Sequence, residues 1–68
     1  MLVSKIKAYI ELSTLTREEI RKEMGVGTNT ISSWCSGKSR PSVEDLFKLA
    51  RLLNVKVDEL YEWREENE

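Results

Sequence analysis

The chain has 68 residues, 40% hydrophobic and 34% charged, a composition typical of one small globular domain. Its net charge is −1, but residues 1–40 hold seven basic and four acidic side chains, whereas residues 41–68 hold four basic and eight acidic ones. One cysteine and no histidine argue against a disulfide or zinc site, and no apolar run approaches the ~20 residues that cross a membrane.

The hydrophobic pattern is helical from the start of the chain. Val3, Ile6, Tyr9 and Ile10 recur at spacings of three and four, which predicts one amphipathic helix. The segment 13–15 interrupts this pattern. We expect no strand before residue 60.

A second helix is predicted over residues 16–24. Thr16 and Glu19 form the T-x-x-E pattern of a capping box, and Gly25 follows where helices commonly end in a left-handed residue. A third helix is predicted over residues 28–36, held from below by Ile31 and Trp34. For Trp34 we favour core packing over base stacking.

Two more helices are predicted in the C-terminal half. Ser42 and Asp45 cap the segment "VEDLFKLARLL", and Asn54 is suited to stop it. Asp58 is expected to cap a last short helix carrying Leu60, Tyr61 and Trp63. The predicted fold is therefore all-α with five short helices, as one domain over residues 1–63 and a charged tail over 64–68.

The second and third predicted helices are joined by a very short turn. This is the plan of a helix-turn-helix, whose second helix enters the DNA major groove. Such a helix needs a polar outer face through which base edges can be read. Four polar side chains fall on that face, a pattern that also fits an ordinary solvated helix: Thr28, Asn29, Ser32 and Ser33.

Residues 6–61 resemble the phage repressor/Cro-type helix-turn-helix proteins, also called the XRE family, which have the lambda-repressor-like fold. The pieces that carry the resemblance are Lys5-Ile6-Lys7, "LTREEIRKEMGVGTNTISSWCSGK" and "RPSVEDLFKLARLLNVKVDELYEW". The resemblance implies base contacts from Thr28, Asn29, Ser32 and Ser33. It also implies contacts to the DNA backbone from Arg17, Lys38 and Arg40.

Two residues depart from the pattern of the family. Arg21 stands where a small alanine is usual between the two helices, so its guanidinium must reach outward over its stem, or the helices must cross more widely. Cys35 stands where glutamate is common; an inert, partly buried thiol is the default interpretation and a redox sensor the alternative. The third helix carries no Arg or Lys, which disfavours guanine readout by that helix.

The predicted function is sequence-specific transcriptional regulation, as a repressor that binds a near-palindromic operator in double-stranded DNA. Small size favours a homodimer, with half-sites about 10 base pairs apart. The dimer surface is expected at Val55, Val57, Leu60, Tyr61 and Trp63, although core capping explains the two aromatic residues equally well. The alternative is a protein-interaction module of the same fold, acting as an antirepressor or antitoxin.

Other functional classes find little support in the sequence. Scattered carboxylates, no histidine base and no phosphate-binding glycine loop argue against an enzyme. We expect no cofactor, metal, small-molecule ligand or membrane partner. The first residues lack the apolar block of a signal peptide, and we expect a cytoplasmic protein.

Overall fold

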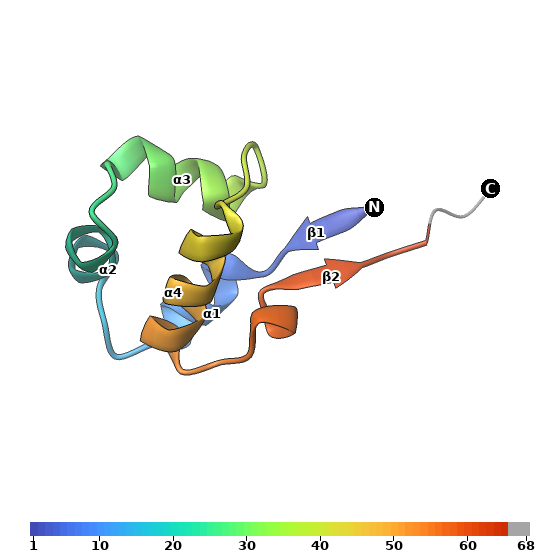
Figure 1. Cartoon of the computed structure of the whole chain (residues 1–68). Coiled ribbons are helices and arrows are strands. Elements are labelled where there is room, and N and C mark those ends of the chain that lie inside the picture. Colours follow the sequence, from blue (N-terminus) through green and yellow to red (C-terminus); the bar gives the residue numbers. More distant parts are fainter. Residues whose placement is uncertain (66–68) are drawn as a thin grey trace.

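The computed structural model describes residues 1–65 and has a mainly helical fold (Figure 1). Four α-helices are followed by a 3₁₀-helix, and a short strand lies at either end of this helical region. The elements are β1 (Leu2–Ser4), α1 (Ile6–Leu12), α2 (Arg17–Met24), α3 (Thr28–Ser36), α4 (Val43–Leu53), η1 (Val57–Glu59) and β2 (Tyr61–Trp63). Of the expected tail 64–68, residues 66–68 lie outside the described part.

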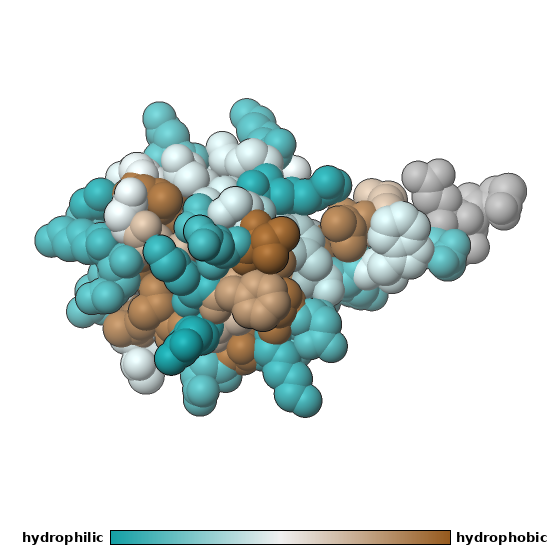
Figure 2. Space-filling view, viewed as in Figure 1, coloured by the Kyte–Doolittle hydropathy of each residue, from teal (hydrophilic) through white to brown (hydrophobic). Residues whose placement is uncertain are grey.

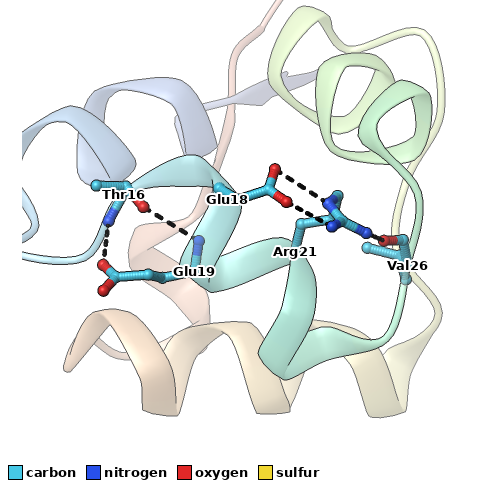
Figure 3. Close-up of polar contacts among 5 residues, drawn as sticks. All are labelled: Thr16, Glu18, Glu19, Arg21 and Val26. Carbon is cyan, nitrogen blue, oxygen red and sulfur yellow. Dashed lines mark hydrogen bonds and ion pairs between the residues drawn. The ribbon is translucent and has the colours of Figure 1, made fainter.

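The local signals that define the helix ends operate as expected. The hydroxyl of Thr16 accepts from the Glu19 amide at 3.1 Å, and the Glu19 carboxylate accepts from the Thr16 amide at 2.8 Å (Figure 3). Ser42 caps α4 by accepting from the Asp45 amide at 3.1 Å. Gly25 and Asn54 end α2 and α4 in the left-handed region, with φ of 70° and 58°. These ends set the short connections that bring the helices together.

The core lies between the helices and is closed by the residue that follows η1. Ile6, Ile20, Ile31, Leu49 and Leu60 are all completely buried. These side chains belong to one cluster to which α1, α2, α3 and α4 all contribute. Burying one such side chain contributes about 1.5–3 kcal/mol relative to leaving it exposed, so the shared cluster holds the four helices together. Trp34 is 3% exposed and belongs to this cluster, which confirms core packing and not base stacking.

The two ends of the chain form strands, whereas Val3 was expected in the first helix and Tyr61 and Trp63 in a fifth helix. Val3 lies in β1, not in the first helix, and Tyr61 and Trp63 lie in β2. The strands pair antiparallel, with Leu2 opposite Trp63 and Ser4 opposite Tyr61. Each strand has three residues, too few to show an alternating pattern, and its partner lies at the other end of the chain. The prediction of helix for these segments, and of no strand before residue 60, was therefore wrong, because pairing between segments distant in the sequence determined their structure.

The paired strands, here called the ribbon (residues 1–4 and 61–64), run side by side away from the helices (Figure 1). The ribbon leaves the body beyond the C-terminal end of α3. Its base is tied to that helix, because the Ser4 hydroxyl donates to the Trp34 carbonyl at 2.9 Å. The position of α3 and the direction of the ribbon are thus linked by a hydrogen bond.

Candidate nucleic-acid interface

The turn between α2 and α3 is closed by backbone hydrogen bonds. The Gly25 amide donates to the Arg21 carbonyl at 2.9 Å, and the Val26 amide donates to the same oxygen at 3.2 Å. This pattern is the left-handed ending that glycine adopts without strain. Ile31 and Trp34 then fasten the inner face of α3 to the core. The opposite face of α3 remains at the surface.

A shallow depression runs along the outer face of α3. It is lined by Asn29, Ser32, Ser33, Ser36 and Lys38. The four helix residues recur at spacings of three and four, so they form one row along the helix. Three of the four expected base-contact residues therefore lie together, with Ser33 half-buried and the other two exposed.

Thr28 does not line this depression, although it precedes Ser32 by four residues on the same helix. It lines the narrow crevice between α2 and α3 together with Arg17, Glu18, Arg21 and Ile31. Thr28 is thus next to Arg17, a residue expected at the DNA backbone.

Ser36 also lines this depression, although it was not among the residues predicted to contact bases. Its hydroxyl donates to the Ser33 carbonyl at 3.2 Å, and the Lys38 amide donates to the same carbonyl at 3.0 Å. These bonds fold the end of α3 back so that Lys38 joins the row. The signal was present in the sequence, because Ser36 follows Asn29 by seven residues and Ser32 by four.

The three expected backbone-contact residues are all exposed but occupy different places. Arg17 stands at the first turn of α2 beside Thr28, and Lys38 stands at the far end of the depression. Arg40 does not line the depression, and its charge acts instead on the phenol of Tyr61 at the base of the ribbon. Positive side chains therefore flank α3 at both ends, while α3 itself carries none.

Arg21 fills the helix crossing in the first of the two ways expected, by reaching outward. Its guanidinium contacts the Glu18 carboxylate through two nitrogens, at 3.3 and 2.5 Å, and donates to the Val26 carbonyl at 3.2 Å (Figure 3). The hydrogen bond from Arg21 lowers the pKa of Glu18, and the same contact raises the pKa of Arg21. Arg21 therefore ties α2 to the turn that precedes α3.

Cys35 is half-buried and packs against the core. Burial raises the pKa of its thiol, which the charges of Arg17 and Lys7 partly oppose. A neutral thiol is a poor nucleophile, so the geometry favours the inert interpretation. Among residues 1–65, no three potential ligands gather where they could hold a metal ion.

The residues expected at a dimer surface fall into three groups. Leu60 is completely buried, so its assignment to that surface is wrong: it closes the core below η1. Val55, Val57 and Tyr61 are half-buried against the core. Trp63 is 64% exposed on the ribbon.

Within residues 1–65, no helix is long and apolar enough to cross a membrane.

Comparison with known proteins is consistent with this geometry. The family model described as helix-turn-helix matches residues 6–60. An uncharacterized HTH-type transcriptional regulator of Methanocaldococcus jannaschii is 36% identical over 58 residues, which cover 85% of this chain and 88% of that protein. The transcriptional repressor RstR of the cryptic phage CTXphi in Vibrio cholerae is 34% identical, over 98% of this chain and 60% of RstR.

A crystal structure of a Bacteroides fragilis protein to which DNA binding has been ascribed has the same fold. It superposes with a TM-score of 0.84 at 40% identity, covering 91% of this chain and all of the other. The helical fold, the short glycine turn, the exposed polar row on α3 and these matches agree with the resemblance seen in the sequence. The chain belongs to the XRE-type helix-turn-helix family of DNA-binding transcriptional regulators and is not an enzyme.

Proposed function

We propose that the protein is a sequence-specific repressor that acts in the cytoplasm as a homodimer on a near-palindromic operator. Helix α3 of each copy enters the major groove of one half-site. The observation that carries this proposal is the exposed row of Asn29, Ser32, Ser33 and Ser36 along α3, with Lys38 at its end. The DNA-binding unit in this proposal spans residues 1–63 together with Arg64, whose backbone pairs with that of Met1.

The chemistry of the row suits base edges more than phosphates. Asn29 can pair bidentately with adenine, and the serine hydroxyls can donate or accept. Phosphate neutralisation comes from the flanks, from Arg17 beside Thr28 and from Lys38 and Arg40. This division leaves α3 uncharged, so sequence preference depends on hydrogen bonds and on DNA shape.

Repression and dimerisation are supported by separate observations. RstR, which is similar over nearly the whole of this chain, is a transcriptional repressor. A single module this small buries little DNA surface, and two copies on a symmetric site double the contacts. On a symmetric site the second copy makes the same contacts to DNA as the first.

Selection from a random duplex library, followed by sequencing, tests the proposal. We expect enrichment of a short palindrome whose half-site centres lie about 10 base pairs apart. Enrichment of an asymmetric site would contradict the dimer. If no duplex is retained even at low salt, DNA binding is refuted, and the protein-interaction alternative, an antirepressor or antitoxin, takes its place.

A further inference from the structure

The outer edge of β2 is open. Among residues 1–65 the ribbon has only two strands, so each strand has one edge without a backbone partner. Figure 2 shows the ribbon standing clear of the helical body, with hydrophobic residues on it. Open edges pair readily with another strand, and Leu2 and Trp63, which lie opposite each other, are 40% and 64% exposed.

The hydrogen bonds inside the ribbon define which residues face the open edge. Met1 and Arg64 exchange both backbone bonds, at 2.6 and 2.8 Å, and the Lys5 amide donates to the Leu60 carbonyl at 2.8 Å. Bonded and non-bonded pairs alternate in an antiparallel ladder, so the intervening pair Leu2–Trp63 is non-bonded. The amide and carbonyl of Trp63 therefore point outward, away from β1.

We infer that a second copy of this chain pairs with β2 along this edge, antiparallel and with the two-fold axis at Trp63. The inference rests on the proposed homodimer and identifies its contact surface. Trp63 of each copy then exchanges two backbone hydrogen bonds with Trp63 of the other. The result is a continuous four-stranded sheet in the order β1-β2-β2-β1.

Charge complementarity singles out this register and this partner. Two-fold pairing at Trp63 places Glu62 of one copy directly opposite Arg64 of the other, twice. Their side chains are 43% and 56% exposed, and within one copy Glu62 already pairs with both Arg64 and Lys5, each at 3.3 Å. Charged residues on an edge usually discourage pairing. Here the alternation of sign makes the edge complementary to itself.

The symmetry of this dimer also suits DNA. A two-fold axis normal to the sheet turns the same face of both copies to one side, as a symmetric operator requires. Because the Ser4 hydroxyl bonds to the Trp34 carbonyl at the base of the ribbon, the joined sheets hold the two recognition helices at a defined separation. The seam is short, so pairing is weak in free protein and is reinforced when both copies bind one operator.

Charge reversal tests the register. Glu62→Arg and Arg64→Glu each place like charges opposite each other, and we expect the dimer dissociation constant to rise roughly tenfold by sedimentation equilibrium. The double variant E62R/R64E restores opposite pairs, as does an equimolar mixture of the two single variants, and both should associate nearly as the wild type does. Glu23→Arg and Lys48→Glu, on α2 and α4, are the matched controls and should not change association.

Proline substitution tests the edge itself. Trp63→Pro removes an outward amide hydrogen that the ribbon does not use, so the monomer should fold while dimerisation is lost. Leu2→Pro removes the matching outward amide on the edge of β1 and should leave dimerisation intact. Thermal unfolding of both variants checks the fold.

Three results overturn the inference and are distinct from failure of the proposed function. They are a wild type that stays monomeric alone and binds operator as one copy, single charge variants that dimerise normally, or a dimer that Leu2→Pro abolishes and Trp63→Pro spares. A chain that dimerises through β2 but binds no duplex would uphold the inference and refute the proposed function instead.

Discussion

At the scale of single residues, the side chains around α3 differ in the kind of contact that they can make with DNA. Asn29 offers a donor and an acceptor in a fixed plane, whereas Arg17 offers charge at the rim. The first arrangement discriminates between bases, and the second neutralises phosphate in any sequence. Their loss should therefore have different signatures.

Replacing each residue by alanine separates these roles. Asn29→Ala should reduce discrimination at one position of the selected site by about 1–3 kcal/mol. Arg17→Ala should weaken binding to all duplexes alike and lower the salt dependence by about one ion per copy. Competition titrations with single-base variants of the site measure both. If both variants bind like the wild type, this docking arrangement is wrong.

The buried hydroxyl of Tyr61 lowers the stability of the fold. The hydroxyl oxygen of Tyr61 is buried and makes no well-formed hydrogen bond among residues 1–65, and burial raises the pKa of the phenol, an effect that the nearby Ser4 side chain and Arg40 partly oppose. Ser4, opposite it, donates its own hydroxyl hydrogen to Trp34. We expect Tyr61→Phe to increase the free energy of unfolding by about 1 kcal/mol in urea titrations. A destabilised variant would show that the hydroxyl is satisfied; Tyr9→Phe is the comparison.

At the scale of elements, the helix-turn-helix is held by more than its glycine. Arg21 joins Glu18 in α2 to the Val26 carbonyl in the turn (Figure 3). An alanine at this position would let the helices approach but would leave the carbonyl to water. Arg21 thus acts as a positioning residue for α3.

Arg21→Ala should weaken operator binding roughly threefold to tenfold, because the hydrogen bond to the Val26 carbonyl that orients the turn is lost. Lys22→Ala, which removes the same charge from an exposed neighbour, should have a smaller effect. Circular dichroism should show unchanged helix content in both. Equal losses in the two variants would reduce the role of Arg21 to charge alone.

The stabilisation that the Glu18–Arg21 contact gives to the fold depends on pH. Because the pKa of Glu18 is lowered in the fold, the stabilisation is complete above the ordinary range of a glutamate and declines as pH falls through the lowered pKa. The turn should therefore be held fully at neutral pH. Titration of the Glu18 carboxyl by NMR in the wild type and in Arg21→Ala, which lacks the contact, checks the direction of this shift.

At the scale of the whole molecule, charge is divided along the chain. The basic first 40 residues include α2, α3 and the Lys38 loop, and the acidic remainder includes α4, η1 and β2. Such a division orients the molecule toward a polyanion despite a net charge of −1.

Operator affinity should fall linearly on a log–log plot as salt rises, with a slope of about −0.9 for each phosphate neutralised. Three cations per copy, in two copies, predict a slope of roughly −5. Fluorescence anisotropy across a salt series measures it. A flat dependence would mean that Arg17, Lys38 and Arg40 do not contact phosphates.

Much of the protein could be predicted from its sequence because the controlling interactions are local. The capping box at Thr16, the left-handed residues Gly25 and Asn54 and the buried faces marked by Ile31 and Trp34 act within a few residues of where they are read. The helix-turn-helix, and with it the family, follows from these signals and their spacing. Ser36 was missed although its helical spacing was visible.

Tertiary structure alone decided what depends on contacts between distant segments. Nothing near Val3 or Trp63 reveals that β1 and β2 pair, because a three-residue strand gains its hydrogen bonds only from its partner. Burial likewise assigned Leu60 to the core and left Trp63 exposed, although both had been expected at one surface. The polar face of α3 could be predicted from the spacing of residues along that segment, whereas the open edge of β2 forms only when the two ends of the chain pair.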